Sequence, residues 1–287
     1  MKIIPFQIPK SGSESFKIQK DELPYFYDKL HQHPEIQISL IIKGEGTLIA
    51  GNSITHFKTG SLYVLGSNVP HVFRSDDRYY LQNAENFCEG ISLYFELNFG
   101  GSSFLDLPEM EPIRNFYSQS GFVYSIEGNS KNFISDELIE IEQSTGFNRV
   151  MQFLKILNLI SKSDDLKKLS GEREYKNYNE KEGKRMNDVL QFTFKESNRQ
   201  IKIEEVAEIA HLTPEAFCRF FKVRTRKTYI NFLNEVRISN ACKLLMNKEE
   251  SISEICFKVG FNNLSNFNRI FKRLTNYSPG EYRKTGN

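Results

Sequence analysis

Tryptophan is absent from this chain, and cysteine is scarce. Four cysteines occur in 287 residues, and none of them stands in a C-x-x-C pair. Without such pairs they are interpreted as reduced, mostly buried thiols rather than a disulfide framework. No apolar run approaches the roughly 20 residues that span a bilayer, and residues 1–10 lack the basic and then apolar order of a signal peptide. The sequence therefore predicts a cytoplasmic protein.

The two ends of the chain differ in charge, although the net charge is only +2. Residues 184–287 contain 19 basic and 11 acidic residues, whereas residues 1–183 contain 19 basic and 25 acidic ones. A basic segment joined to an acidic one favours a polyanionic partner for the C-terminal part alone. A lysine-rich face is more often merely solvated, so the charge does not decide by itself.

The first half of the chain has the pattern of short strands. Residues 40–94 are rich in β-branched and aromatic residues and are broken by turn residues such as Gly44 and Gly51. Several short strands at this spacing predict a β-sandwich or barrel.

Apolar residues follow helical spacing after Ser130, in two runs separated by Gly146. The positions are Ile134, Leu138 and Ile141 in the first run, and Val150, Phe153, Leu154, Leu157 and Ile160 in the second. We expect these helices to cover the open side of the barrel. Residues 163–183 are rich in charged residues and Asn, so they predict a linker. The fold class is therefore α+β with two domains: a β-barrel followed by helices over residues 1–162, and an all-α domain over residues 184–287.

The helical C-terminal region repeats itself at an offset of fifty residues without a gap. Glu204 matches Glu254, and Ile209 matches Val259. Aromatic and basic positions match in the same register: Phe217, Arg219, Phe221 and Lys222 in the first copy, and Phe267, Arg269, Phe271 and Lys272 in the second. Chance would rarely preserve so many residue types, so we predict two copies of one unit.

Each copy predicts a helix, a tight turn and a second helix. In the first copy His211 lies in the turn, and Thr213 caps the second helix. In the second copy Ser251-x-x-Glu254 is a capping box, and Gly260 supplies the left-handed residue that ends the first helix.

The second helix of each copy has an aromatic stripe, which must face the core, and a polar stripe. The polar stripes hold Glu215, Cys218, Arg219 and Lys222 in one copy, and Ser265, Asn268, Arg269 and Lys272 in the other. Arg and Asn can make bidentate contacts with guanine and adenine in the major groove. The helix starts at Thr213 and Asn263 can receive phosphates. A single arginine here would more often be a solvated charge, but two in register on a basic domain favour double-stranded DNA as the partner.

One long helix is predicted over residues 228–247, between the two copies. It would hold the two reading helices at a fixed separation. One chain would then meet two consecutive major grooves about 34 Å apart.

The strongest signature lies in Ile255–Arg283. It comprises Gly260-Phe261, Phe267-x-Arg269-x-Phe271-Lys272, Ser278-Pro279 and Tyr282-Arg283. In order and spacing it resembles the signature of the AraC/XylS family of transcription regulators, and the likeness extends over residues 184–284. The resemblance implies these base-facing positions: Glu215, Cys218 and Arg219 in the first recognition helix, and Leu264, Ser265, Asn268 and Arg269 in the second.

Two positions depart from the family pattern, which usually has glycine after each recognition helix. This chain has Arg226 and Asn276 there. Asn tolerates the left-handed conformation, whereas Arg226 would be strained in it.

The N-terminal half resembles the two cupin motifs that precede the DNA-binding part in many AraC-type regulators. The residues are His31-x-His33-x-x-x-Gln37 followed by Gly44, and Gly60 and Gly66 followed by Asn68 and His71. Alternation along a strand places His33, Glu35 and Gln37 on one face. We therefore predict an effector site made by His31, His33, Glu35, Gln37, Tyr63 and His71.

In metal-binding cupins the position of Gln37 is normally Glu. His31, His33 and His71 with the amide oxygen of Gln37 could hold a divalent transition metal, but the amide contributes no charge. Neutral histidine hydrogen-bonds a small molecule as readily as it binds a metal, so we expect no metal and no other cofactor.

Together these features predict a sequence-specific transcription regulator, not an enzyme, controlled by a small-molecule effector such as a sugar. One alternative is a metal-dependent cupin enzyme, which bound transition metal would indicate. Another is an architectural DNA-binding protein without an effector. The resemblance also implies RNA polymerase as a partner, and a homodimer paired in part through the apolar seam of the helices between residues 134 and 162.

Overall fold

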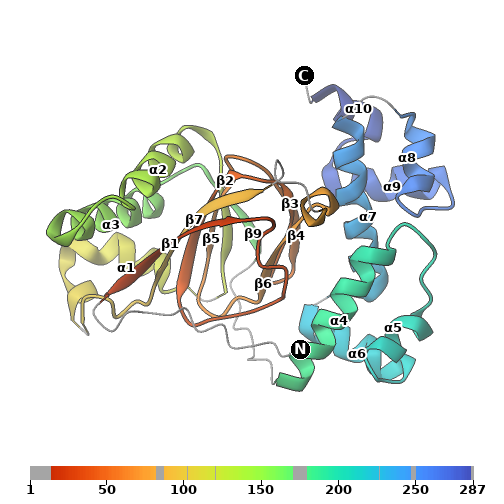
Figure 1. Ribbon diagram of the computed structural model, residues 1–287, viewed down its shortest axis with the longest axis horizontal. Coiled ribbons are helices and arrows are strands. Elements are labelled where there is room, and N and C mark those ends of the chain that lie inside the picture. Colours follow the sequence, from red (N-terminus) through yellow and green to blue (C-terminus); the bar gives the residue numbers. More distant parts are fainter. Residues whose placement is uncertain are drawn as a thin grey trace. The chain divides into compact units, whose positions relative to one another are not determined.

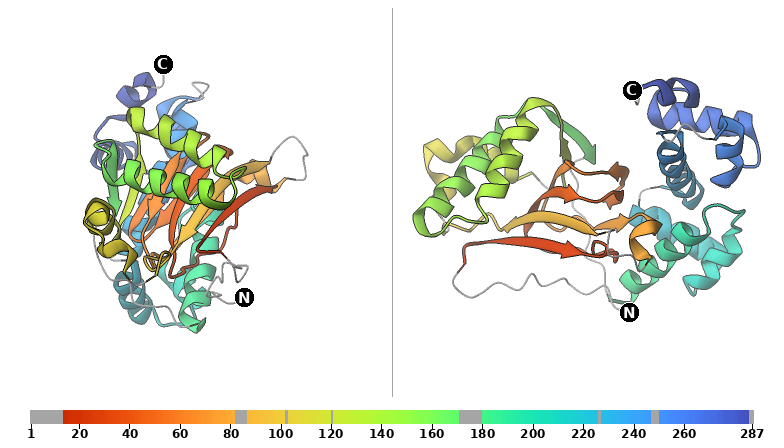
Figure 2. Two further views of the ribbon diagram at one scale, coloured as in Figure 1. Left: turned by 90° about the vertical axis from the view of Figure 1, so that its left-hand side faces the viewer. Right: turned by 45° about the horizontal axis from the view of Figure 1, so that its top comes forward.

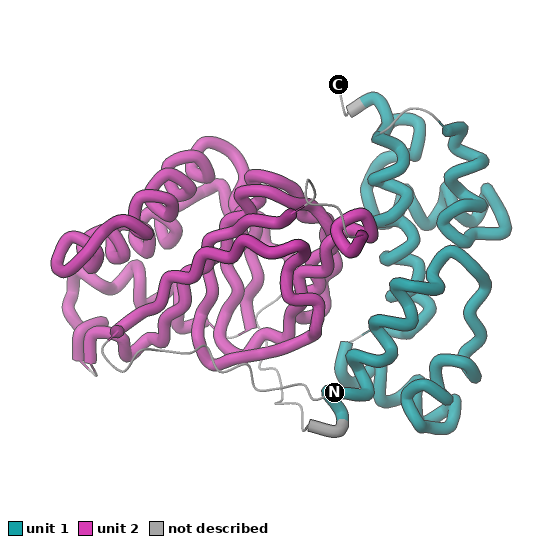
Figure 3. The backbone as a smooth tube through the Cα atoms, in the orientation of Figure 1, with its two compact units in different colours: residues 1–3, 178–287 teal, residues 4–177 magenta. Residues whose placement is uncertain are grey.

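The computed structural model describes residues 14–81, 87–101, 103–119, 121–170, 180–225, 227–246 and 250–285. The chain divides into two compact units, one over residues 4–177 and the other over residues 1–3 and 178–287, here called the N-terminal and the C-terminal unit (Figure 3). Among the described helices, none is both long and apolar enough to cross a membrane.

The N-terminal unit contains two antiparallel β-sheets (Figure 1). A large sheet has the strand order β1-β7-β2-β5-β8-β9, and a small sheet has the order β4-β3-β6. The strands are β1 (Phe16–Leu23), β2 (Ile36–Lys43), β3 (Gly46–Ala50), β4 (Ser53–Phe57), β5 (Leu62–Leu65), β6 (His71–Ser75), β7 (Cys88–Phe95), β8 (Val123–Ile126) and β9 (Leu166–Ser170). Leu48, Phe57 and Phe73 of the small sheet pack against Ile41 and Leu65 of the large one. The predicted β-rich domain is confirmed.

Strand β2 is buried on both faces. Ile36 and Ile38 belong to the core on the outer side of the large sheet. Gln37 pairs with Leu65, which packs towards the small sheet. Because alternate side chains of a strand point to opposite faces, Gln37 and Ser39 lie between the two sheets.

Helices cover the outer face of the large sheet (Figure 2). They are α1 (Glu111–Tyr117), α2 (Gly128–Glu140) and α3 (Gly146–Ser161), accompanied by the short 3₁₀ helices η2 (Phe104–Asp106) and η3 (Pro108–Met110). A further 3₁₀ helix, η1 (Asp77–Tyr80), follows β6, and its Tyr79 joins the core between the sheets. Helices α2 and α3 do cover the β-rich domain, but they pack on the outer face of the large sheet rather than over an open side of a barrel. Five residues of the predicted seam have no exposed surface: Leu138, Ile141, Phe153, Leu157 and Ile160. These five cannot also pair two copies of the chain, and that part of the dimer prediction is wrong.

The linker predicted over residues 163–183 is wrong in its first part. Leu166–Ser170 form β9, the edge strand of the large sheet, which pairs with β8. Lys167 and Lys168 are exposed on this strand, and lysines are a common feature of edge strands. Helix α4 (Glu180–Glu196) begins before the predicted domain start at residue 184.

The C-terminal unit is all-α in its described part. Besides α4 it contains α5 (Ile203–Ile209), α6 (Pro214–Thr225), α7 (Tyr229–Met246), α8 (Ile252–Lys258), α9 (Leu264–Thr275) and α10 (Pro279–Thr285). The first copy is α5 with α6, the second copy is α8 with α9, and α7 is the long helix predicted between them. The ring of Phe221 in α6 lies 5.3 Å from that of Phe232 in the first half of α7. Ala241 and Leu245 in its second half join the core of the second copy.

The two copies differ by one residue in the turn. Helices α6 and α9 are offset by fifty residues as predicted, but α5 and α8 are offset by forty-nine. Glu205 and Glu254 each accept a hydrogen bond from the main-chain N–H before their helix, at 2.8 and 2.7 Å. Glu205, not Glu204, is therefore the counterpart of Glu254, and the gap-free alignment is wrong for the first helix. The adjacent glutamates concealed the shift.

Three of the turn residues have a left-handed backbone. Gly260 has a φ of 94° and Asn276, at the end of α9, has a φ of 65°, as the sequence predicted. His211, in the turn of the first copy, has a φ of 51°. Arg226 lies outside the described residues, so the strain predicted there stays a prediction.

Candidate functional site

Helix α6 presents its predicted polar stripe to solvent. Phe217 and Phe221 are fully buried, each with its ring 5.4 Å from that of Tyr229 in α7. On the other side, four predicted residues are exposed: Glu215, Cys218, Arg219 and Lys222. The buried rings fix the rotation of α6, so its polar stripe faces outward.

Helix α9 repeats this arrangement. Phe267, Ile270 and Phe271 are buried, and five predicted residues are exposed: Leu264, Ser265, Asn268, Arg269 and Lys272. Arg269 Nη2 donates a hydrogen bond to Asn266 Oδ1 at 2.9 Å. This bond orients the guanidinium group on the outer face of the helix.

Thr213 and Asn263 stand at the starts of α6 and α9, as predicted. Thr213 Oγ1 accepts from Ala216 N at 3.3 Å, and Asn263 Oδ1 accepts from Asn266 N at 2.9 Å. Both side-chain oxygens cap their own helices. A phosphate at either position would therefore be received by main-chain N–H groups of the first turn.

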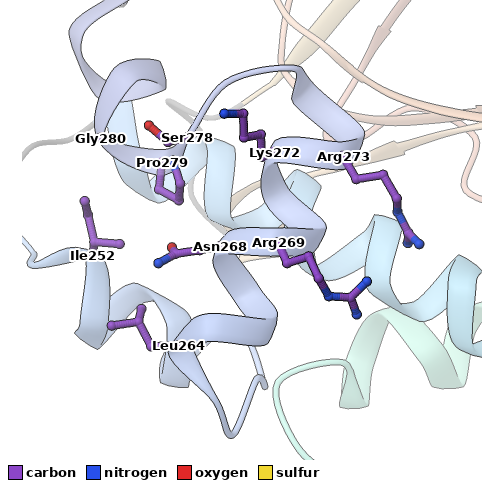
Figure 4. A pocket seen from close by; sticks show the side chains of 9 residues that line it. All are labelled: Ile252, Leu264, Asn268, Arg269, Lys272, Arg273, Ser278, Pro279 and Gly280. Atoms are coloured by element: carbon purple, nitrogen blue, oxygen red, sulfur yellow. The ribbon is translucent and has the colours of Figure 1, made fainter.

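An open hollow lies beside α9 (Figure 4). It is lined by Ile252, Leu264, Asn268, Arg269, Lys272, Arg273, Ser278, Pro279 and Gly280. Asn268 extends towards Ile252, whereas Arg269 and Arg273 extend to the other side of α9. Three of the lining residues are basic and none is acidic, which suits a phosphate backbone. Sequence reasoning missed Arg273, although its position four residues after Arg269 placed it on the same helical face.

The N-terminal unit brings most of its predicted site residues together between the two sheets. His31, His33 and His71 are all buried, and their nearest ring nitrogens lie within 4.8 Å of one another. Gln37 Oε1 lies 3.1 Å from His33 Nε2, and Glu35 Oε2 lies 3.5 Å from His33 Nδ1. We call His31, His33 and His71 the histidine cluster.

Each histidine of the cluster has one nitrogen paired with a main-chain carbonyl. The Nδ1 atoms of His31, His33 and His71 lie 2.9, 3.0 and 2.8 Å from the carbonyl oxygens of residues 29, 35 and 69. Because only an N–H can donate to a carbonyl, these contacts favour a proton on Nδ1 and an acceptor at Nε2 in His31 and His71, whereas His33 also faces an oxygen acceptor, Gln37 Oε1, at its Nε2. The buried Nε2 of His71 has no hydrogen-bond partner among the described residues.

Burial keeps the cluster uncharged. It lowers the pKa of His31 to about 4, and it lowers the pKa of His33. The pKa of His71 falls well below its usual value, first through burial and then through the nearby His31 and His33. All three imidazoles are therefore neutral at neutral pH.

Tyr63 is placed differently from the other predicted effector residues. Its ring packs against Phe73 in the apolar core between the sheets, and its hydroxyl donates to His56 O at 3.2 Å. Among the described residues, no hydrogen bond or ring contact joins Tyr63 directly to the histidine cluster. Its role in the effector site therefore stays a prediction.

A chain of polar contacts that sequence reasoning missed continues from Gln37 instead. Gln37 Nε2 donates to Ser39 Oγ at 2.7 Å, and Ser39 Oγ lies 2.8 Å from Ser92 Oγ. The ring of Tyr94 lies 5.5 Å from that of His33. The alternation of Gln37 and Ser39 along β2 was the available signal.

The histidine cluster fits a divalent transition metal. Ligating histidines are neutral and usually hold their second ring nitrogen against a carbonyl or carboxylate, as these three do. A neutral His33 has one proton for two oxygen acceptors, Glu35 O at Nδ1 (3.0 Å) and Gln37 Oε1 at Nε2 (3.1 Å). A cation held by Nε2 would leave that proton for the carbonyl at Nδ1. The expectation of a metal-free site remains a prediction.

Two family models match the chain. A helix-turn-helix domain matches residues 206–285, and an AraC-like ligand-binding domain matches residues 17–87. The second match includes the whole histidine cluster, and the first includes both polar stripes.

The chain is also similar to known proteins over most of its length. The chain is 24% identical to the uncharacterised HTH-type transcriptional regulator YdeC of Bacillus subtilis, over 90% of this chain and 87% of the relative. It is 24% identical to the HTH-type transcriptional activator RhaS of Klebsiella pneumoniae, over 96% and 94%. The structure of ToxT from Vibrio cholerae covers 94% of this chain and 98% of its own, with 15% identity and a TM-score of 0.37. The chain therefore belongs to the AraC family of DNA-binding transcription regulators, with a cupin-like ligand-binding domain before two helix-turn-helix copies.

Proposed function

We propose that this regulator reads two boxes on one face of duplex DNA, with α6 in one major groove and α9 in the next. The observation that supports this most is that both helices combine a buried aromatic stripe with an exposed stripe containing Arg219 or Arg269. Helix α7 joins α6 to the second copy, and α6, α7 and α9 belong to one compact unit. The boxes would then lie about one helical turn apart, or about 34 Å.

Selection of bound duplexes from a random DNA pool tests this function. The full-length protein should recover a motif with two boxes, and Arg219→Ala and Arg269→Ala should each relax one of them. Binding that is sensitive to salt but indifferent to sequence would contradict it and indicate an architectural protein.

The effector site that we propose is the buried polar cluster of His31, His33, Glu35, Gln37 and His71. Several donors and acceptors in one buried place suit a molecule with several hydroxyl groups, such as a sugar. The effector regulates DNA binding only if it prefers one arrangement of the protein over another. The output is recruitment or blocking of RNA polymerase in the cytoplasm, and the cupin-like domain has no catalytic role in this scheme. A sugar that raises the melting temperature and changes DNA affinity would support the proposal.

A divalent metal is a second candidate ligand for the same site, favoured by the three Nδ1–carbonyl pairs and the unpaired His71 Nε2. His31, His33 and His71 would hold the ion, with Gln37 Oε1 beside it. A bound cation would offer a positive centre for an oxygen-bearing effector.

Calorimetric titration of chelator-treated full-length protein with Ni²⁺ or Zn²⁺ is expected to show one ion per chain. At ten times the Kd, the ion should add about 1.4 kcal/mol to the free energy of unfolding. His71→Ala should abolish the effect, whereas His56→Ala, which lies outside the histidine cluster, should keep it. Equal binding by both variants would rule out the cluster as the metal site.

We propose a homodimer that uses the exposed side of α3 instead of the buried seam. Phe147 is 75% exposed and Met151 is 52% exposed, and they form one apolar stripe with Val150 and Leu154.

Phe147→Asp is expected to convert the dimer to monomers in analytical ultracentrifugation, because a carboxylate would be buried in the interface. The matched control is Phe133→Asp on α2, because Phe133 is 66% exposed and is not part of the α3 stripe. A Phe147→Asp protein that remains dimeric would show that this stripe is not the interface.

A further inference from the structure

Arg237, in the middle of α7, is a buried arginine that the DNA-reading face does not use. Only 6% of its surface is exposed. Its Nε donates to Ser197 O at 2.8 Å, and its Nη2 donates to Arg199 O at 2.6 Å. Its guanidinium group also lies over the ring of Phe261, 5.6 Å from the centroid.

These contacts reach two separate places, the segment after α4 and the turn of the second copy. Ser197 and Arg199 follow α4. Thr193 Oγ1 of α4 lies 2.9 Å from the hydroxyl oxygen of Tyr229 in α7, and the Tyr229 ring packs against Phe217 and Phe221 of the first copy. Arg224 of α6 also forms an ion pair with Glu182 of α4. Phe261, by contrast, lies in the turn of the second copy and belongs to its core. Arg237 thus joins the end of α4 to the turn of the second copy.

Gly260 provides an independent sign that these segments lie against each other. A Cβ atom at this position would come within 2.3 Å of Ser197 O and 3.0 Å of Arg237 Nε. The main chain after α4 and the turn before α9 therefore touch without an intervening side chain. The two copies are connected here as well as through α7.

The chemistry of the contact requires arginine. Burial lowers the pKa of Arg237, and the two carbonyl oxygens are the hydrogen-bond acceptors that offset the loss of water. A guanidinium group is planar and presents donors in a fixed fork, so it can hold two carbonyls at once. A lysine ammonium has no such fork.

We infer that Arg237 is a positioning residue that fixes α6 relative to α9, and so determines which spacing between two DNA boxes the protein accepts. This inference rests on the proposed two-box function. In B-DNA one inserted base pair shifts a box by about 3.4 Å and rotates it by about 35°. A protein whose two copies are rigidly connected would bind the lengthened site more weakly. A protein whose copies move independently would keep most of its affinity.

The test measures the affinity of full-length protein for a spacing series. The probes are the tightest duplex selected with wild-type protein, the same duplex with one, two or three base pairs inserted between the boxes, and a duplex with one box scrambled. For wild type, a two-base-pair insertion is expected to lower affinity about a hundredfold, because the base contacts of one helix are lost. For Arg237→Met the loss should shrink to about tenfold while one-box affinity stays within about twofold, with Arg237→Lys between the two.

Arg283→Met is the matched control. Arg283 Nη2 donates to Glu250 O at 2.7 Å, which is an arginine–carbonyl bond within the second copy and α10 alone. The Arg283→Met protein should show the same dependence of affinity on box spacing as the wild type. If Arg237→Met lowered affinity by one common factor on every duplex, Arg237 would only stabilise the domain and the inference would be overturned. A wild-type protein indifferent to spacing would overturn the two-box function and the positioning role together.

Discussion

Acidification from about pH 7 to pH 4 is expected to lower the free energy of unfolding of the N-terminal unit by about 3 kcal/mol through His31 alone. Burial holds the pKa of His31 at about 4 in the folded protein, whereas an unfolded chain has a histidine pKa of about 6.5. Between these two values the unfolded state binds a proton that the folded state does not. Stability is therefore complete above about pH 6.5 and is lost as the pH falls towards 4. Burial shifts His33 and His71 in the same direction, so they add to the loss.

Hydrogen exchange of the full-length protein in the presence of a chelator is the suitable measurement, because it separates the amides of β2 and β6 from those of the C-terminal unit. Their protection should fall steeply below about pH 6.5 after correction for intrinsic exchange. His31→Asn should reduce this dependence, leaving the part due to His33 and His71, while His56→Asn should keep it. Equal stability of β2 at pH 4.5 and pH 7 would contradict a neutral buried cluster.

The helix-turn-helix copies could be predicted closely because their signals are local. The aromatic stripe of α9, the Asn263 cap and the left-handed Asn276 are all set by residues within one or two turns of each other. The one-residue difference between the turns could not be predicted, since Glu204 and Glu205 offer equal matches to Glu254. Only the hydrogen bonds distinguish them.

Long-range features of the N-terminal unit were predicted less well. Strand β9 carries exposed lysines because it is an edge strand, and this composition is also typical of a linker. The histidine cluster follows from motif spacing, but the contact of Ser39 with Ser92 depends on β2 pairing with β7, fifty-three residues away. The bond from Arg237 to Ser197 is a similar case, because nothing near either residue in the sequence indicates the other.

Arg269→Ala is expected to lower affinity for the selected duplex by about 10- to 100-fold, equivalent to about 1–3 kcal/mol for one bidentate base contact. The native guanidinium is exposed on α9 and already oriented by Asn266 Oδ1 at 2.9 Å. Less conformational freedom is then lost when it meets a base edge. Arg219→Ala should have a smaller effect, because the acidic Glu215 and the apolar Cys218 occupy the same exposed stripe and offer the DNA less.

Salt titrations distinguish side chains that contact bases from side chains that contact phosphates. Lys272→Ala should weaken binding to all duplexes alike and reduce the slope of log affinity against log salt by about 0.9, as expected for one lost phosphate contact. Arg269→Lys keeps the charge but loses the planar fork, so it should lose discrimination at one box while retaining most of that slope. Lys258→Ala, at an exposed lysine paired with Glu250 at 2.8 Å outside the polar stripe, is the control and should change neither quantity. If Arg269→Lys instead preserved discrimination at both boxes, Arg269 would contact phosphate rather than a base, and the reading role would pass to Asn268 and Ser265.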